Sequence, residues 1–223
     1  MKTAILLVGN IRTWSYCKDN FIQTFGHLNP DIFVSTYNLQ YNHHPYIQNL
    51  IGDNEDVLLT NEEIVNIFSD VNIKNISIDS NLNYTLPETV NSLFSGLETT
   101  FHQYVNFFKS VQIMEKFDKY DLVIKTRCDL LYNPINFDNA LNSIIIDSGN
   151  VYPNDCILIS NKDNIVNISK FIMQEFFNPL YNTSHITPPH GLLNNAINHL
   201  NIPVQQQKIM NCVVRKGNKL QQY

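Results

Sequence analysis

The sequence predicts an α/β fold, in which a mostly parallel sheet carries helices on both faces within a single domain of 223 residues. Three observations predict this fold. Short apolar runs alternate with amphipathic segments, no internal repeat or linker interrupts the alternation, and 43% of the residues are hydrophobic. Strands that alternate with helices build parallel sheets, and this apolar content is enough for a packed core.

The first elements follow from apolar runs and turn residues. Residues 3–8 are continuously apolar and end at Gly9, as a buried parallel strand does. Apolar positions over residues 14–25 predict a helix, and Gly26 is expected to stop it. Residues 31–36 form a second short apolar run, which predicts the next strand.

The next segment is polar before regular structure resumes. Residues 37–50 are rich in histidine and tyrosine and are expected to form a loop. Thr60 and Glu63 have the spacing of a capping box, which predicts a short helix over residues 61–68. Residues 71–78 alternate apolar and polar side chains, as a half-exposed or edge strand does.

The clearest helix spans about residues 98–117, where apolar side chains recur every three or four positions. A strand over residues 121–126 follows it, and the polar residues Arg127 and Asp129 stand at the carboxyl end of that strand. The remaining expected elements are strands near 150–152 and 156–160 and helices over about 162–176 and 190–200.

Composition excludes several classes of function. A net charge of −5 and a pI near 5.7 argue against nucleic acid as the main partner. Seven glycines do not suffice for a glycine-rich phosphate loop as the main device. The cysteines form no close pair, which argues against a zinc knuckle or a disulfide scaffold. They are Cys17, Cys128, Cys156 and Cys212.

The expected location is the cytoplasm, which would be the host cytoplasm if the chain is viral. The first apolar run is too short for a signal-peptide core before Arg12 interrupts it. No apolar stretch approaches the roughly 18 residues of a membrane span, so no transmembrane segment is expected. The aromatic content of 11% leaves room for a homodimer interface.

Polar side chains cluster where the predicted strands end. Ligands of open α/β sheets lie beyond the carboxyl ends of the strands. Residues 9–13, 36–38 and 125–129 follow three such strands, and two of these groups contain an arginine, Arg12 or Arg127. A guanidinium fork fits phosphate oxygens, which indicates an anionic ligand such as a nucleotide diphosphate. The alternative is that these arginines are solvated or salt-bridged.

Asp129 is a candidate metal ligand. Mg²⁺ and Mn²⁺ take carboxylate oxygens together with substrate phosphate and water, so one or two protein carboxylates can suffice. A metal there would bridge the two phosphates and stabilise the charge that grows on them as they leave. The alternative is that Asp129 caps the turn that follows its strand.

Residues 4–14 (AILLVGNIRTW) and residues 31–37 (DIFVSTY) resemble the LSGQLRTF opening and the DIFIHTW segment of a group of small bacterial and viral glycosyltransferases. Residues 120–130 (YDLVIKTRCDL) resemble YDxVIRTRPDL, and residues 154–160 weakly resemble DxxxxG. The segments keep the order of the group and span about residues 1–160.

The resemblance implies a GT-A-like glycosyltransferase with a Rossmann-like, mostly parallel sheet. Such an enzyme moves a sugar from a nucleotide-sugar donor to a glycan or lipid-linked acceptor, as in polysaccharide biosynthesis. The donor-binding part would cover about residues 1–135 and the acceptor-side part about residues 136–223. The implied donor-binding residues lie against the nucleotide and its diphosphate. They are Gly9, Asn10, Arg12, Tyr37, Gln103 and Arg127.

The implied metal site departs from the GT-A pattern. A D-x-D motif holds Mn²⁺ or Mg²⁺ in that fold, and here Arg127 occupies the position of its first aspartate. Either Asp129 holds the metal with help from elsewhere, or Arg127 does part of the work of the cation. His190 lies where GT-A enzymes often provide a late histidine ligand. The alternative for His190 is a structural role at the start of a helix.

Asp155 is the implied catalytic base. An inverting transferase needs a carboxylate to take the proton of the acceptor hydroxyl, and Asp155 matches the acidic position of the group. Turn capping is the alternative, and a retaining enzyme would not need this base. Two other functions stay open. One is a non-catalytic nucleotide-sugar-binding domain in a glycan-synthesis assembly. The other is a nucleotidyltransferase, against which the isolated Gly9 counts.

Overall fold

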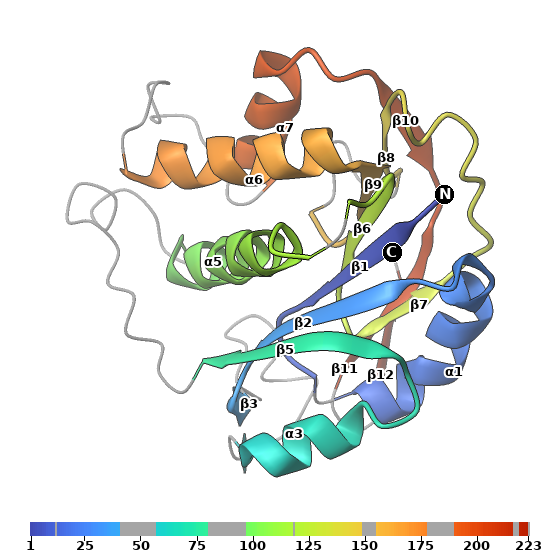
Figure 1. Ribbon diagram of the computed structural model, residues 1–223, viewed down its shortest axis with the longest axis vertical. Helices are drawn as coiled ribbons and strands as arrows, with labels where there is room; N and C mark the ends of the chain where they lie inside the picture. Colours follow the sequence, from blue (N-terminus) through green and yellow to red (C-terminus); the bar gives the residue numbers. More distant parts are fainter. Residues whose placement is uncertain are drawn as a thin grey trace.

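The computed structural model describes residues 1–11, 13–40, 57–79, 97–117, 119–148, 155–177, 190–215 and 219–222. Within them, a seven-stranded sheet with the order β10-β8-β9-β6-β1-β2-β5 forms the centre of the molecule (Figure 1). Its strands are β1 (Thr3–Val8), β2 (Asp31–Tyr37), β5 (Ile73–Asp79), β6 (Leu122–Thr126), β8 (Ile144–Asp147), β9 (Leu158–Asn161) and β10 (Val204–Gln207).

The sheet is mostly parallel, which confirms the predicted fold class. Strand β1 pairs in parallel with β2 and with β6, β2 with β5, and β8 with β10. Strand β9 is the exception, because it runs antiparallel to both β6 and β8. As a consequence, β9 begins at the edge of the sheet where β6 ends. The residues that precede β9 therefore lie beside the residues that follow β6.

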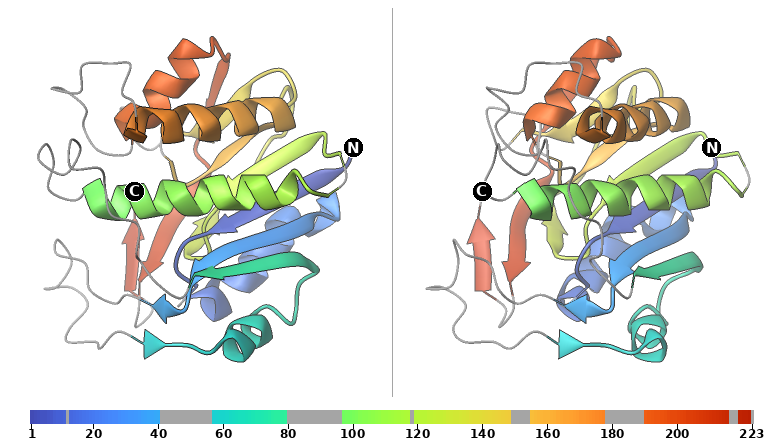
Figure 2. Two further views of the ribbon diagram at one scale, coloured as in Figure 1. Left: turned by 60° about the vertical axis from the view of Figure 1, so that its left-hand side comes forward. Right: turned by 90° about the vertical axis from the view of Figure 1, so that its left-hand side faces the viewer.

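Helices cover both faces of the sheet, as the alternating pattern predicts. Helices α5 (Leu97–Met114), α6 (Lys162–Phe177) and α7 (His190–His199) lie on one face. Helices α1 (Trp14–Phe25) and α3 (Asn61–Ile67) lie on the other (Figures 1 and 2). The apolar side chains of β1 alternate between two cores, since Leu6 packs under α5 and Leu7 packs under α1. A continuous apolar strand is buried on both sides for this reason.

Helix α1 ends at Phe25 with Gly26 as its C-cap, as the sequence predicts. Gly26 has a φ of −59° and begins a 3₁₀ turn, Gly26–Leu28. The left-handed residue is Asn29, with a φ of 45°. Asparagine tolerates this conformation because its short polar side chain can hydrogen-bond locally. The chain therefore turns towards β2 after this 3₁₀ turn.

The capping box of α3 is confirmed. The Thr60 hydroxyl accepts a hydrogen bond from the backbone N–H of Glu63 at 3.2 Å. The Glu63 carboxylate accepts one from the backbone N–H of Thr60 at 2.7 Å. Strand β5, which follows, is half-buried and occupies the edge of the sheet next to β2, as the alternation over residues 71–78 predicts.

Several strands were not predicted. Strand β7 (Leu130–Tyr132) pairs with β11 (Met210–Arg215), which pairs with β12 (Lys219–Gln222), in a second sheet. Strands β8 and β10 were also missed. Strand β3 (Leu39–Gln40), which pairs with β4 (Val57–Leu58), begins inside the expected loop. The expected strand near 150–152 lies outside the described residues. Among the helices that the structure describes, none is both long and apolar enough to cross a membrane.

Candidate functional site

The candidate site lies at the carboxyl edge of the central sheet. Strands β1, β2 and β6 are parallel and end there, and β9 begins there because it runs in the opposite direction. The edge therefore gathers Gly9 after β1, Tyr37 at the end of β2, and Arg127 after β6. Asp155, just before β9, joins them. The first turns of α5 face the same edge, since Gln103 hydrogen-bonds to Asp155.

Asp155 is held from two sides. The side-chain amide of Gln103 donates a hydrogen bond to the Asp155 carboxylate, and the ammonium group of Lys125 donates one to the Asp155 backbone carbonyl. Asp155 is only 4% exposed and Lys125 only 1%. Buried polar groups that hydrogen-bond in this way have fixed positions, because losing a partner in the interior costs free energy. The turn before β9 is therefore anchored to both α5 and β6.

Lys125 is a buried cation that sequence analysis left without a role. Burial lowers the pKa of its ammonium group, and the nearby Asp155 carboxylate opposes that shift. The ammonium nitrogen also lies 5.8 Å from the centre of the Phe107 ring on α5. One feature of the sequence points to this residue: Lys125 is the single charged position in the otherwise apolar or neutral run Leu122–Thr126. A charge inside a buried strand has to be paired.

Arg127 and Asp129 form a two-pronged ion pair at the end of β6. The Arg127 Nε donates to Asp129 Oδ1 at 2.8 Å, and Nη2 donates to Oδ2 at 2.6 Å. Burial alone would lower the pKa of Arg127, but Asp129 and Cys156 hold that pKa above its ordinary value. The Asp129 side chain is 2% exposed, whereas that of Arg127 is 24% exposed. The guanidinium is therefore the member of the pair that a ligand can reach.

The described residues do not fit a divalent metal at Asp129. Both carboxylate oxygens of Asp129 already accept hydrogen bonds from a protonated guanidinium. Across the described ranges, no group of three or more His, Cys, Asp or Glu side chains is placed to hold a metal ion. His190 begins α7, and its side chain lies outside the described part of the chain. Ligation by His190 stays a prediction, and ligation by Asp129 would require its carboxylate to give up the bonds from Arg127.

The segment after β1 carries features of a binding site. Gly9 has a φ of +97°, and a Cβ added there would meet no atom of the described residues within 4 Å. Asn10 Oδ1, Thr13 Oγ1 and Trp14 Nε1 are buried atoms without hydrogen-bond partners in the structure described. Unpaired buried polar atoms of this kind invite water or ligand. Arg12, which lies between these residues, is outside the described residues.

Tyr37 and Asn106 connect β2 to α5. The Tyr37 hydroxyl donates to the backbone carbonyl of His102 at 2.8 Å, and the Tyr37 ring is 7% exposed. The Ser35 hydroxyl donates to Asn106 Oδ1 at 3.3 Å, while Asn106 Nδ2 is buried with no partner among the described residues. Tyr37 thus links the end of β2 to α5 beside the site. Its contact with a base or ribose stays a prediction.

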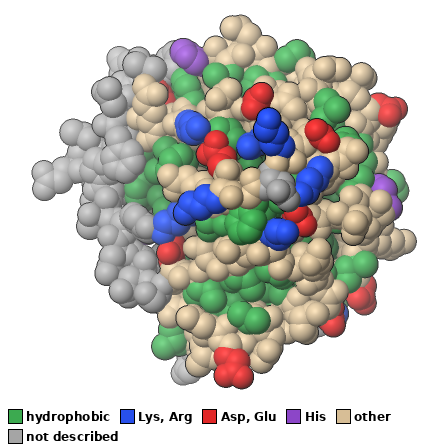
Figure 3. Space-filling model, in the orientation of Figure 1, with side chains coloured by type: hydrophobic (Ala, Val, Ile, Leu, Met, Phe, Trp, Pro, Cys, Tyr) green, Lys and Arg blue, Asp and Glu red, His purple; other side chains and the backbone are tan. Residues whose placement is uncertain are grey.

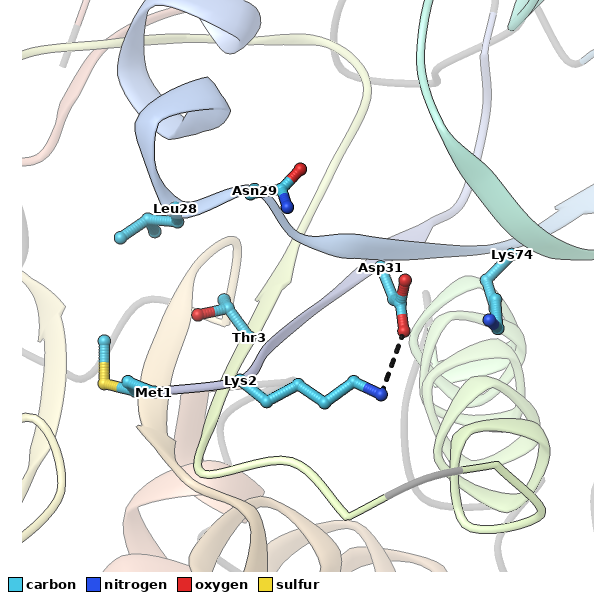
Figure 4. A pocket seen from close by; sticks show the side chains of 7 residues that line it. All are labelled: Met1, Lys2, Thr3, Leu28, Asn29, Asp31 and Lys74. Atoms are coloured by element: carbon cyan, nitrogen blue, oxygen red, sulfur yellow. Dashed lines mark ion pairs between the residues drawn. The ribbon is translucent and has the colours of Figure 1, made fainter.

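A pocket of about 480 Å³ lies at the opposite edge of the sheet, away from these residues. It is open and sits where β1, β2 and β5 begin (Figure 4). Lys2 and Asp31 form an ion pair of 3.7 Å in its wall. None of the predicted site residues lines it. The other residues of the wall are Met1, Thr3, Leu28, Asn29 and Lys74. We therefore place the candidate site by its side-chain chemistry and not by this pocket.

Charges are mixed on the face of the molecule that Figure 3 shows. Basic side chains gather across its middle, with acidic side chains among them (Figure 3). Lys109 on α5 pairs with Asp79 at the end of β5 at 2.7 Å, and Lys170 on α6 pairs with Glu115 at 3.6 Å. Both cations therefore have an acidic partner.

Comparisons with known proteins give a distant likeness to solved structures. No family model and no curated protein matches the chain. Among solved structures, the chain is similar to the galactosyltransferase LgtC in complex with donor and acceptor sugar analogs. The TM-score is 0.48 at 9% sequence identity, and the match covers 92% of this chain and 72% of that one. At this level the likeness carries no argument about chemistry, so the candidate site has to be argued from its own residues.

Proposed function

We propose that the protein is a GT-A-like glycosyltransferase that moves a sugar from a nucleotide-diphosphate-sugar donor to a glycan or lipid-linked acceptor. One observation supports the proposal above the others. A partly exposed guanidinium, Arg127, and a carboxylate that α5 holds in place, Asp155, lie at the same carboxyl edge of the sheet. An inverting transferase needs both an anion-binding group and a base at one site.

The donor occupies the ends of β1, β2 and β6 in this proposal. Gly9 and Asn10 lie against the nucleotide, where a positive φ and open space let the ligand approach the backbone. Arg12 belongs to the same segment. Gln103 and Tyr37 form the wall beside α5. Arg127 binds the diphosphate through charge-assisted hydrogen bonds, which are stronger than neutral ones.

Asp155 acts as the base in an inverting transfer. Its carboxylate takes the proton of the acceptor hydroxyl as that oxygen attacks the anomeric carbon. The bond between the anomeric carbon and the diphosphate oxygen breaks, and the nucleoside diphosphate leaves with the electron pair. Arg127 stabilises the charge on that leaving group. For the acceptor to reach Asp155, the hydroxyl replaces or joins the Gln103 amide at the carboxylate.

A specific observation favours a second candidate, a non-catalytic nucleotide-sugar-binding domain. The carboxylate expected to hold the metal is already paired with Arg127 through both oxygens. If transfer requires a metal there, the domain binds a nucleotide-sugar without turning it over. The two candidates share the donor site and differ only in chemistry.

The experiment that tests the proposal measures donor turnover by the purified protein across a panel of nucleotide-sugars. For the active donor, Asp155→Asn should lower the rate of transfer or hydrolysis roughly 10²- to 10⁴-fold, the usual contribution of a general base. The shift in melting temperature on binding that donor should be retained. Asp163→Asn, which changes an aspartate in the first turn of α6, is the matched control and should keep full activity.

Three results are informative. Loss of turnover with retained binding in Asp155→Asn supports the enzyme. Binding by the unmodified protein without any turnover supports the non-catalytic domain instead. If no nucleotide-sugar raises the melting temperature, both candidates are wrong, because a ligand at 100 times its Kd stabilises a protein by about 2.7 kcal/mol.

A further inference from the structure

Arg127 and Asp129 differ sharply in how accessible they are. The side chain of Asp129 is 2% exposed, and that of Arg127 is 24% exposed. A ligand that enters the carboxyl edge of the sheet from solvent therefore meets the guanidinium before it can meet the carboxylate. The more accessible positive charge attracts an anion, and it repels a cation that would bind the carboxylate.

Arg127 keeps donors for a ligand while it stays paired with Asp129. A guanidinium has five N–H donors in a rigid plane. In the structure, Nε and Nη2 each donate to Asp129, and Nη1 lies 3.8 Å from Cys156 Sγ. The remaining donors have no hydrogen-bond partner among the described residues. An anion can thus bind Arg127 without displacing Asp129.

The pairing fixes the orientation of the guanidinium before a ligand arrives. Arginine loses considerable conformational entropy when it is immobilised, and a group that is already immobile loses less on binding. Cys156, on the other side, limits rotation further through its contact with Nη1. Asp129 therefore contributes to anion binding by holding Arg127 in place.

A divalent cation at Asp129 would oppose the same pairing. The cation would have to replace two charge-assisted hydrogen bonds to a carboxylate that solvent hardly reaches. It would also sit within a few ångströms of a protonated guanidinium, whose charge repels it. Neither cost arises for a phosphate group at Arg127.

We propose that Asp129 is a positioning residue for Arg127, and that this arginine binds the donor diphosphate without a divalent cation. The proposal rests on the proposed function, because it concerns the diphosphate of the same donor. It assigns Asp129 a role through Arg127 in place of metal ligation.

The first test measures binding of UDP, GDP, CDP, ADP and inorganic pyrophosphate by calorimetry, in excess EDTA and in MnCl₂. For the diphosphate that binds, the two Kd values should agree within roughly threefold. The electron paramagnetic resonance signal of free Mn²⁺ should not fall when protein alone is added. Mixtures of Mn²⁺ and diphosphate without protein provide the baseline. Binding at least tenfold tighter in Mn²⁺, or a stoichiometric Mn²⁺ site in the protein alone, would overturn the proposal.

The second test uses variants in EDTA. Removal of the fork in the double variant Arg127→Gln with Asp129→Asn should weaken binding roughly tenfold or more. That variant removes both charges together, which avoids leaving an unpaired buried carboxylate that would unfold the chain. Arg127→Lys keeps the charge without the fork and should lie between the double variant and the unmodified protein.

Asp129→Asn separates positioning from metal binding. It should weaken diphosphate binding in EDTA, by a smaller factor than the double variant, with the same factor in Mn²⁺. An effect confined to Mn²⁺ would instead identify Asp129 as a metal ligand. Lys170→Gln, which removes a cation paired with Glu115 at 3.6 Å, is the matched control and should not change binding. Circular dichroism confirms that each variant is folded.

The failure of this proposal differs from the failure of the proposed function. Binding that depends on Mn²⁺ and on Asp129 overturns the proposal and leaves the transferase in place. If no diphosphate binds with or without Mn²⁺, and no nucleotide-sugar does either, both are wrong.

Discussion

The side-chain amide of Gln103 on α5 donates a hydrogen bond to the carboxylate of Asp155, which lies 52 residues later in the chain. The bond joins a helix on one face of the sheet to the turn that begins β9. Lys125 holds the backbone carbonyl of the same turn from β6. The proposed base is therefore positioned by two elements, α5 and β6, that come well before it in the chain and meet it at one edge of the sheet.

The contact between Gln103 and Asp155 predicts a coupling in stability. In a double-mutant cycle of Gln103→Ala and Asp155→Ala, urea denaturation should give a coupling free energy of about 1–3 kcal/mol, since a charged carboxylate accepts the bond in a buried setting. Gln112→Ala on the exposed side of α5 is the matched control and should change the free energy of unfolding by less than about 0.5 kcal/mol. Additive effects of the two site variants would contradict the contact.

Lys125 predicts a pH dependence. Burial lowers the pKa of its ammonium group below the ordinary value of 10.5. Between the lowered pKa and 10.5, the unfolded chain binds more protons at this position than the folded chain, so stability rises with pH. The free energy of unfolding of the unmodified protein should therefore increase relative to that of Lys125→Met as the pH approaches 10.5. Urea denaturation across that pH range measures both proteins. A difference in the free energy of unfolding that stays constant or falls with pH would contradict the burial of the charge.

Cys156 predicts that stability changes with pH in the opposite direction, and falls as the pH rises. Burial raises the pKa of its thiol from 9.0 to about 11, although Arg127 opposes the shift. Between these values the thiol holds its proton in the folded chain and loses it in the unfolded chain. Its contribution to stability is therefore full below pH 9 and is lost as the pH rises to about 11. The loss is about 2–3 kcal/mol for a shift of this size.

The comparison for Cys156 is with Cys156→Ala, measured by urea denaturation between pH 8 and pH 11. The free energy of unfolding of the unmodified protein should fall relative to the variant over the upper part of this range. Parallel curves for the two proteins would show that the thiol ionises equally in the folded and unfolded chains, against a pKa of about 11.

The core strands could be predicted because their sequence pattern is strong. Residues 3–8, 31–36 and 121–126 are nearly continuous apolar runs, and such runs are buried on both faces of a parallel sheet. The short strands β7 and β10 to β12 lack such a pattern, and the apolar run of β8 is only three residues long, Ile144–Ile146. Their pairing depends on tertiary contacts, such as the bonds from the backbone N–H groups of Ile209 and Met210 to Asp147. Local sequence does not encode contacts of this range.

The candidate site was predictable in part. The strand-end rule located Gly9, Tyr37 and Arg127, because each follows a recognisable strand. Asp155 reaches the same edge only because β9 runs antiparallel to β6, and the sequence did not predict that direction. The alternative of a salt-bridged Arg127 is confirmed by its contact with Asp129. The side chains of Arg127 and Asp129 follow the same strand, but their spacing in the sequence does not determine whether they form an ion pair.

Gly9 and Gly26 offer a matched pair of substitutions. Gly9 has a φ of +97°, which a residue with a Cβ rarely adopts, and no atom in the described part of the chain lies within 4 Å of its Cβ position. Gly9→Ala should therefore reduce the free energy of unfolding by about 1–3 kcal/mol through backbone strain, without a steric clash. Under the proposed function, the added methyl group also projects beside the nucleotide and should weaken donor binding.

Gly26→Ala should have the opposite effect on stability. Gly26 has a φ of −59°, which alanine adopts freely, and its Cβ would lie 3.6 Å from the Ile22 side chain, an ordinary contact. The substitution restricts the unfolded chain and should stabilise the protein by about 0.4–1 kcal/mol. Urea denaturation of both variants measures the difference. If Gly9→Ala is no more destabilising than Gly26→Ala, Gly9 does not hold its positive φ in solution. The proposed close approach of a ligand to the backbone there would then lose its structural basis.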